Sequence, residues 1–368
     1  MATKENQYTP QTVSHPGKTL MAKLEELKMG PKEFAIRTGK PEKTISSIIA
    51  GESSITPDMA VLFEDVLSIP AKFWLNRQQN YNEAVARLKK QESVAKDLDW
   101  ADFFPYAEMA KLGWITTTRK KEEKVDHLYK YFRVANQLAF EDYYFNQKLK
   151  LSFRLTRTLE KKPYAIAAWL RQGEIQASEL DTVLYDEKKL VSNLTGIKTL
   201  MANHPSDFFK QLQKICLEAG VKVVYTPCLP GASIHGSTRW IGDTPLIQMS
   251  AKYAQNDIFW FTFFHEVAHI IKHGKKYIAL ENVDYQEEDK VKEKEADDFA
   301  IKWTFSEEQE QEVLRNTPLT EKAIFDFAKK FNTHPGVIIG RFHYKKLIHY
   351  SVGKKYIVKI DISDNRKS

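Results

Sequence analysis

The sequence predicts a mainly α-helical protein with a small α+β part near its C-terminal end. Apolar residues recur at helical spacing along most of the 368 residues, and Gly and Pro divide these segments into short helices. A chain of this length can form two or three domains, each with its own core. We expect a helical N-terminal domain over 15–82, a helical middle region over 83–204 and a further domain over 205–368.

The N-terminal domain is predicted to contain four or five short helices. The expected segments are 17–29, 31–38, 41–50 and one that begins at Pro57. Gly30-Pro31 and Gly39 separate the first three, since Pro often starts helices and Gly often ends them. Two short helices joined by a turn that contains Gly, followed by further packing helices, form the helix-turn-helix layout.

This domain is similar to Xre-type DNA-binding domains, and most closely to HigA-type antitoxins. The matching residues are Phe34-Ala-x-x-Thr-Gly39, Thr44-Ile-Ser46 and Ile49-x-Gly51. The resemblance implies that helix 41–50 enters the major groove of operator DNA and that the protein binds as a homodimer. The side chains expected at the DNA are Glu42, Lys43, Thr44 and Ser47, with Lys32 and Lys40 near phosphates.

The alternative for the N-terminal domain is a module that only dimerises or docks a protein. Glu42 favours this alternative, because its carboxylate would repel phosphate, although it can accept a hydrogen bond from a cytosine amine.

The middle region is predicted to be a helical spacer. Its expected amphipathic segments are 100–105, 109–114, 125–132, 164–170 and 174–184, with Gly173 between the last two. No catalytic motif occurs in this region.

The segment His265-Glu-Val-Ala-His269 follows the apolar run 258–264 and carries the strongest chemical signal in the chain. Residues four apart share one face of a helix, so His265 and His269 can bind one metal ion. Glu266 can reach a metal-bound water but is poorly placed to be a ligand itself. Two ligands, a base and an open coordination position are what a zinc hydrolase needs. Coincidence is the alternative, because this pattern arises by chance in about one such chain in fifty.

A catalytic zinc site usually takes a third protein ligand, and the next helical segment offers two glutamates. Its apolar stripe includes Ala296 and Ala300, and Glu293 lies one turn before Ala296 on that stripe. Glu295 points about 200° away from Glu293 and is expected to face solvent. We therefore predict Glu293 as the ligand, and Asp297, one turn later, as the acceptor of a free ring N–H from a zinc-bound histidine.

These motifs resemble the ImmA/IrrE family of zinc metallopeptidases. The histidine pair is followed by Glu293-x-Glu-Ala-Asp-x-Phe-Ala300, and segments 229–240 and 245–250 resemble the strands that precede the zinc helix in that family. The resemblance implies a zincin-like domain with a thermolysin-like core, a small sheet, Zn²⁺ as cofactor and Glu266 as general base. In the best-known members the substrate is a DNA-binding repressor of the helix-turn-helix type.

The function expected from these features is a DNA-binding transcriptional regulator with a zinc endopeptidase domain that cleaves a partner protein. The partner is expected to be a repressor or a toxin–antitoxin component, and the activity can be latent. Zinc would bring the pKa of its bound water down to about 7, and Glu266 would take the proton and pass it to the leaving amine.

The group that stabilises the tetrahedral intermediate is left open by the sequence. The candidates are His235, Arg239, His273 and Tyr277. His273 is explained equally well as a surface histidine at a helix end, where a cation is favoured.

The alternative function is a non-enzymatic, HigA-like antitoxin or transcription factor whose zinc domain is structural or sensory. A fourth protein ligand, for instance His273 or Cys228, would close the coordination sphere and favour this alternative.

Composition sets wider bounds. The chain has 55 Lys and Arg against 48 Asp and Glu, a net charge of +7 that is compatible with nucleic acid without establishing it. Two cysteines without a C-x-x-C motif indicate a reducing compartment. Since no apolar stretch of about 18 residues or leader-like segment occurs, we expect a cytoplasmic protein that does not span a membrane.

Overall fold

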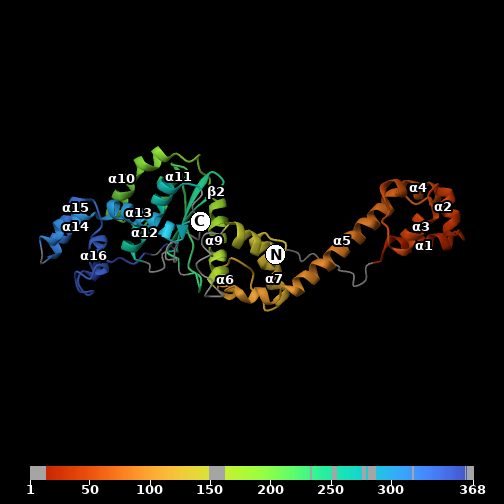
Figure 1. Ribbon diagram of the computed structural model, residues 1–368, viewed down its shortest axis with the longest axis horizontal. Coiled ribbons are helices and arrows are strands. Elements are labelled where there is room, and N and C mark those ends of the chain that lie inside the picture. The colour runs from red at the N-terminus through yellow and green to blue at the C-terminus, as the bar shows by residue number, and fades with distance from the viewer. Residues whose placement is uncertain are drawn as a thin grey trace. The chain divides into compact units, whose positions relative to one another are not determined.

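The computed structural model describes residues 14–148, 162–232, 234–250, 255–275, 279–280, 287–316, 319–360 and 362. The chain divides into an N-terminal unit, residues 1–96, and a C-terminal unit, residues 97–368 (Figure 1). The sequence predicted a boundary after residue 82, but helix α5 (Ala71–Lys96) runs through that position because it contains no Gly or Pro to end it. Residues 83–96 of the predicted middle region belong to the N-terminal unit and residues 97–204 to the C-terminal unit, and the independence of this region as a domain stays a prediction.

The N-terminal unit contains the predicted helix-turn-helix arrangement. Its helices are α1 (Pro16–Glu26), α2 (Pro31–Thr38), α3 (Glu42–Ala50), α4 (Pro57–Leu67) and α5. Gly39 and Gly51 end α2 and α3 in the left-handed conformation, with φ of 63° and 82°. The core that these helices share includes Phe34, Ile48 and Trp74. The expected number and order of N-terminal helices are therefore confirmed.

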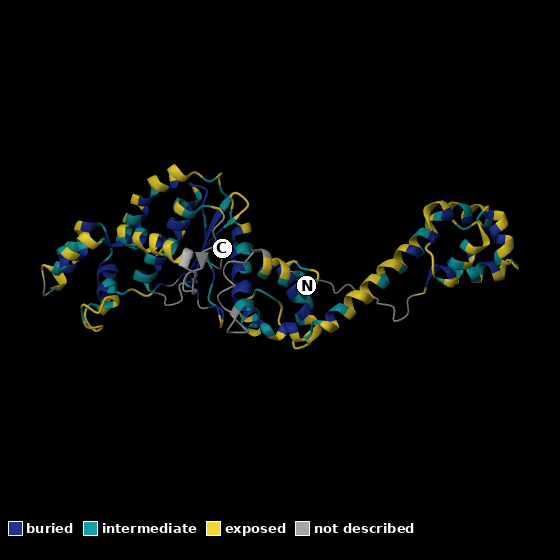
Figure 2. Cartoon of the chain, viewed as in Figure 1, coloured by how far each residue is buried: buried dark blue, intermediate teal, exposed yellow. Residues whose placement is uncertain are grey.

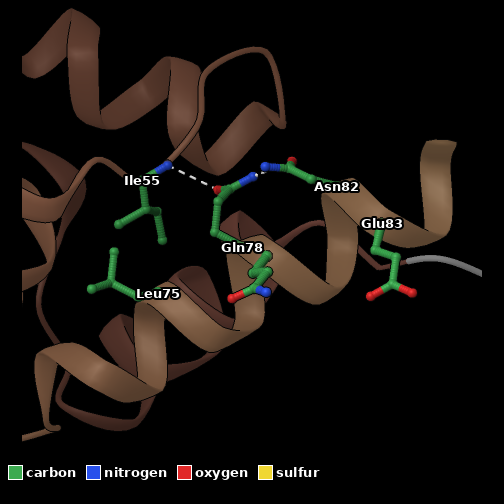
Figure 3. Close-up of a pocket in the computed structure, with 6 residues that line it drawn as sticks. Ile55, Leu75, Gln78, Asn82 and Glu83 are labelled. Atoms are coloured by element: carbon green, nitrogen blue, oxygen red, sulfur yellow. Dashed lines mark hydrogen bonds between the residues drawn. The ribbon is translucent and has the colours of Figure 1, made fainter. Parts of the chain in front are cut away.

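The first half of α5 is held to this core by one buried amide. Gln78 is 5% exposed, and its Oε1 accepts a hydrogen bond from the Ile55 amide at 2.9 Å. Its Nε2 donates to Asn82 Oδ1 at 2.9 Å (Figure 3). The later turns of α5 are mostly exposed (Figure 2).

The C-terminal unit begins with helices. They are η1 (Asp99–Phe103), α6 (Tyr106–Lys111), α7 (Lys121–Phe132), α8 (Gln137–Phe140), η2 (Glu141–Lys148), α9 (Lys162–Ser178), α10 (Glu187–Asn203) and α11 (Phe208–Leu217). Two helices were predicted over 164–170 and 174–184, but α9 is one helix that continues through Gly173. This glycine serves packing, because a Cβ there would lie 2.1 Å from Gln248 Oε1.

A four-stranded sheet forms the centre of the C-terminal unit. Its strands are β1 (Lys222–Tyr225), β2 (Gly236–Ile241), β3 (Thr244–Met249) and β4 (Ala279–Leu280), in the order β1-β3-β2-β4. β3 pairs parallel with β1 and antiparallel with β2, and β4 pairs antiparallel with β2. β2 and β3 overlap the segments 229–240 and 245–250, where strands were expected. The zincin-like classification of this domain stays a prediction.

Helices cover both faces of the sheet (Figure 1). On one face, the Thr238 hydroxyl donates to the Glu266 carbonyl of α12 (Asn256–Ala268) at 2.9 Å. On the other, Arg239 Nη2 donates to the Leu170 carbonyl of α9 at 2.6 Å. Consecutive residues of a strand point to opposite faces, so β2 lies between α12 and α9.

The chain continues as helices around α12. They are η4 (His269–His273), α13 (Glu287–Thr304), α14 (Glu307–Leu314), α15 (Glu321–Phe331), α16 (Pro335–Tyr344) and η5 (Lys354–Tyr356). Within the apolar run 258–264 of α12, Ile258 and Phe261 are half-buried and line a cavity, whereas Phe259, Trp260 and Phe263 are buried. α12 is apolar on nearly every side, so periodicity did not identify its most buried face. None of the described helices is long and apolar enough to cross a membrane.

We predict that Gly173→Ala lowers the free energy of unfolding by about 1–3 kcal/mol, because the new methyl group must displace the buried Gln248 side chain. Gly196, in the exposed middle of α10, is the matched control, since nothing lies within 4 Å of a Cβ there. Gly196→Ala should raise stability by about 0.5–1 kcal/mol. Urea unfolding of the full chain measures both values, and equal effects of the two substitutions would contradict the packing role of Gly173.

Candidate metal centre and DNA-facing helix

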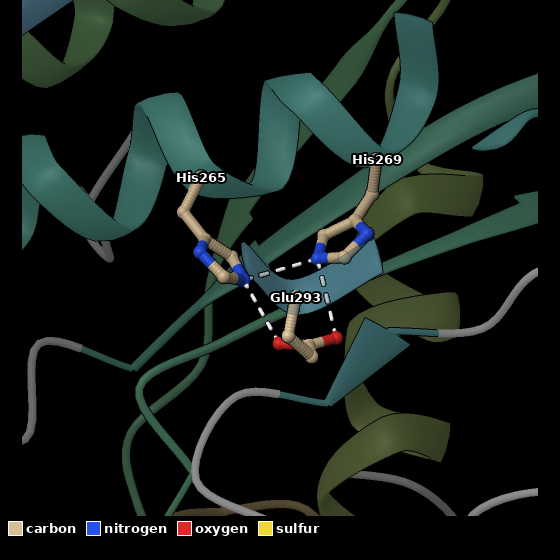
Figure 4. A group of neighbouring side chains, drawn as sticks. All are labelled: His265, His269 and Glu293. Carbon is tan, nitrogen blue, oxygen red and sulfur yellow. Dashed lines mark hydrogen bonds and ion pairs between the residues drawn. The ribbon is translucent and has the colours of Figure 1, made fainter. Parts of the chain in front are cut away.

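Three side chains from two helical segments converge in the C-terminal unit. His265 lies in α12, His269 begins η4, and Glu293 projects from α13 (Figure 4). The two Nε2 atoms are 3.0 Å apart. Glu293 Oε2 is 3.2 Å from His265 Nε2, and Oε1 is 3.5 Å from His269 Nε2. The three residues that the sequence predicted as metal ligands are thus brought together.

The spacing of these donor atoms fits a single zinc ion. A tetrahedral ion with ligand distances of about 2.0–2.1 Å needs donors roughly 3.3–3.4 Å from one another. The observed separations, 3.0 to 3.5 Å, lie around this value, with a different carboxylate oxygen of Glu293 facing each histidine. Among the described residues the metal-capable group consists of His265, His269 and Glu293, without His273 or Cys228. This donor set therefore leaves room for a fourth ligand from outside the group.

Each histidine is held by a partner on its other ring nitrogen. Asp297 Oδ1 lies 3.0 Å from His265 Nδ1, where the sequence analysis predicted that Asp297 would accept the free ring N–H of a histidine ligand. His273 Nδ1 lies 2.8 Å from His269 Nδ1, and His273 Nε2 lies 3.1 Å from Glu295 Oε2. These contacts leave both Nε2 atoms directed at the cluster, and they place the Glu295 carboxylate away from it.

Burial keeps His269 in the form that binds metals. Desolvation, reinforced by the neighbouring His265 and His273, lowers the pKa of His269 from 6.5 to about 2. The imidazole is therefore neutral at physiological pH, and a neutral imidazole offers its lone pair to a metal ion.

Glu266, the predicted general base, is fully buried against the sheet. Its residue exposure is 0%, and both carboxylate oxygens are closed to solvent. A Cβ on Gly236 of β2 would lie 2.6 Å from Glu266 Oε1, so only glycine leaves space for this side chain. Water must reach this carboxylate before it can act as a base.

A cavity of about 640 Å³ adjoins the cluster and runs between α12, α13 and α16. His265 and Glu293 line it, and apolar side chains such as Phe261 and Ile301 form much of its wall. Its size is within the range of small-ligand sites, and one wall carries metal-capable groups. The cavity is large enough for part of a polypeptide in contact with the cluster.

The four candidates for stabilising a tetrahedral intermediate have different positions. His235 lines the cavity and remains a candidate. Arg239 is excluded, because its guanidinium packs on α9 across the sheet from α12. His273 contacts the far side of the His269 ring, and Tyr277 lies outside the described residues.

Helix α3 of the N-terminal unit presents part of the predicted DNA-contacting set. Glu42 and Lys43 are exposed, whereas Thr44 and Ser47 are half-buried beside the core residues of the helix. Lys32 at the start of α2 is exposed, and Lys40 is half-buried. Ser46, which was not in the predicted set, is also exposed on α3, one turn after Glu42.

Comparison with known proteins covers the N-terminal part. The chain is 31% identical over 71 residues to the Escherichia coli K12 protein YddM, described as an uncharacterized HTH-type transcriptional regulator; the match spans 19% of this chain and 76% of YddM. The N-terminal region belongs to the HTH-type transcriptional regulators. No protein-family model matches this chain.

Solved structures that are similar to part of this chain include two antidote proteins. A HigA-family addiction module antidote protein from Coxiella burnetii is 30% identical, covers 24% of this chain and 96% of its own, and gives a TM-score of 0.22. A putative antidote protein of a plasmid maintenance system from Nostoc punctiforme is also 30% identical, with coverages of 23% and 91% and a TM-score of 0.22. A Pseudomonas aeruginosa protein in complex with its operator DNA is 28% identical, with coverages of 21% and 84% and a TM-score of 0.20.

We predict one zinc ion per chain in protein refolded or purified with zinc. Glu293→Gln should weaken zinc binding because it removes a donor of the cluster. The loss should exceed the roughly 10–100-fold that follows from removing a residue that only hydrogen-bonds to a metal ligand. Glu295→Gln, at the other glutamate considered as the ligand, should weaken zinc binding less than Glu293→Gln and keep one zinc per chain. Competition with a chromophoric chelator gives both affinities, and the reverse ranking would reject Glu293 as the ligand.

Proposed function

We propose that this protein is a DNA-binding transcriptional regulator that carries a zinc-dependent endopeptidase site. The convergence of His265, His269 and Glu293 beside a cavity of about 640 Å³ is the observation that carries the enzymatic part. The helix-turn-helix arrangement and the match to an HTH-type regulator support the DNA-binding part.

In this proposal the chain's own residues divide the work. His265, His269 and Glu293 would hold Zn²⁺, which supplies Lewis acidity for water attack on a peptide carbonyl. Glu266 accepts a proton from the attacking water on a carboxylate oxygen and delivers it to the leaving amine. Asp297 fixes the ring of His265, and the cavity holds the substrate chain against the cluster.

The proposed substrate is a partner protein, either a repressor or a toxin–antitoxin component. The proposed DNA-binding form is a homodimer, because operator half-sites are usually read by a two-fold symmetric protein.

The burial of Glu266 supports a second candidate function. Its carboxylate is closed to solvent and is not among the residues that line the cavity. A zinc site whose glutamate carboxylate cannot reach water would not catalyse hydrolysis. In an antitoxin-like transcription factor such a site would be a structural or sensory element. In the enzymatic proposal the same burial corresponds to a latent state that opens before cleavage.

The cleavage test uses co-expression with the products of the neighbouring genes. We expect wild type to remove one partner band and Glu266→Gln to leave it intact, with the rate lower by at least about 10²-fold because no group takes the proton. Zinc content should be equal in the two proteins, since Glu266 is not in the donor group. Equal cleavage by both would refute the mechanism, and no cleavage under any condition, with zinc bound, would favour the sensory candidate.

The DNA test is a gel shift with the gene's own upstream sequence. Lys43→Ala should weaken binding and reduce the slope of log affinity against log salt by about 1, because one phosphate contact is lost. Lys89→Ala, an exposed lysine in the later part of α5, is the charge-matched control and should leave the slope unchanged. If both substitutions act equally, α3 is not the DNA-facing helix and the protein-docking alternative gains support.

A further inference from the structure

Two residues outside the donor group form a chain of contacts behind His269. His273 and His269 face each other through their Nδ1 atoms at 2.8 Å, with ring centroids 4.9 Å apart. The second nitrogen of His273 lies 3.1 Å from Glu295 Oε2. The His273 side chain is 5% exposed, whereas that of Glu295 is 49% exposed, so the contacts lead from a buried ring to the surface.

The local backbone explains this alignment. α12 passes at His269 into the π-helical turn η4, which ends at Gly274 with φ of 66°. His273 therefore follows His269 by one wide turn and lies behind it. π-Helical turns inside helices are rare and occur frequently at functional sites.

Proton positions along this chain of contacts follow from the use of Nε2 as a metal donor. When His269 Nε2 donates its lone pair, the ring proton is on Nδ1 and is donated to His273 Nδ1. His273 must then carry its own proton on Nε2, which is donated to the Glu295 carboxylate. Both hydrogen bonds are satisfied in one direction only, and that direction fixes the tautomer of His269.

We propose that His273 and Glu295 are positioning residues that hold His269 in its metal-binding tautomer and orientation. This inference rests on the proposed zinc site and adds to it a second outer support, built from a histidine and a glutamate, beside the Asp297 contact on His265. Neither residue touches the donor atoms at Nε2, so both act through His269.

The test measures zinc affinity of the full chain by chelator competition, without reference to cleavage. His273→Ala should raise the dissociation constant by about 10–100-fold, the usual effect of losing an outer partner. Glu295→Gln should raise it less, because its carboxylate is half exposed. Asp298→Asn is the matched control: it removes the same charge from an exposed position on the same helix and should leave the constant within about two-fold.

Two further variants separate positioning from general destabilisation. The double variant His273→Ala/Glu295→Gln should bind zinc as His273→Ala does, because Glu295 acts only through His273. His273→Asn keeps an acceptor near the Nδ1 position and should recover much of the lost affinity, while becoming insensitive to Glu295→Gln.

The outcomes distinguish this inference from the function on which it rests. A wild-type chain that binds no zinc refutes the zinc site itself. Zinc binding that is unchanged in His273→Ala, or lowered equally by Asp298→Asn, refutes the positioning role and leaves the zinc site intact. Unfolding of the metal-free variants by urea checks that each one folds, and additive losses in the double variant would also overturn the proposal.

Discussion

The packing of α13 against α12 is the constraint on which the candidate site depends. The histidines come from one helical segment and Glu293 from the other, so the three-residue cluster is complete only when the two helices are docked. Ala296 and Ala300 of α13 are both fully buried, and small side chains of this kind let packed helices approach closely. The sheet behind α12 provides the opposing surface, with Thr238 bound to the carbonyl of Glu266.

The parts of the site that follow helical periodicity were accessible from the sequence. Four-residue spacing put His265 and His269 on one face, and the stripe through Ala296 separated Glu293 from Glu295. Asp297 was found in the same way, as the residue one turn after Glu293. These relations are local to one helix, or need only that two apolar faces meet, and sequence patterns report such relations well.

Other features depend on contacts between distant segments. Gly173 is needed because Gln248 of β3 packs closely against it. The local sequence does not show this contact, so the sequence analysis predicted that a helix ends near Gly173. Arg239 was a candidate for stabilising the tetrahedral intermediate, but its position in β2 directs it to the face of the sheet that α9 covers. The π-helical turn at His269 has no signal in the sequence, and the contact of His273 with the first ring depends on it. The burial of Glu266 likewise requires the sheet to be in place.

The three donors span a segment of the chain that a bound cation would close into a loop. The 23 residues between His269 and Glu293 would be cross-linked at both ends, which lowers the conformational entropy of the unfolded chain as well as joining two helices. Ion binding to the folded form alone also stabilises it in proportion to the logarithm of the free ion concentration. With zinc bound as proposed, the docking of α13 on α12 would be coupled to the ion supply, and the availability of zinc in the cell would set the fraction of molecules in which these helices are docked.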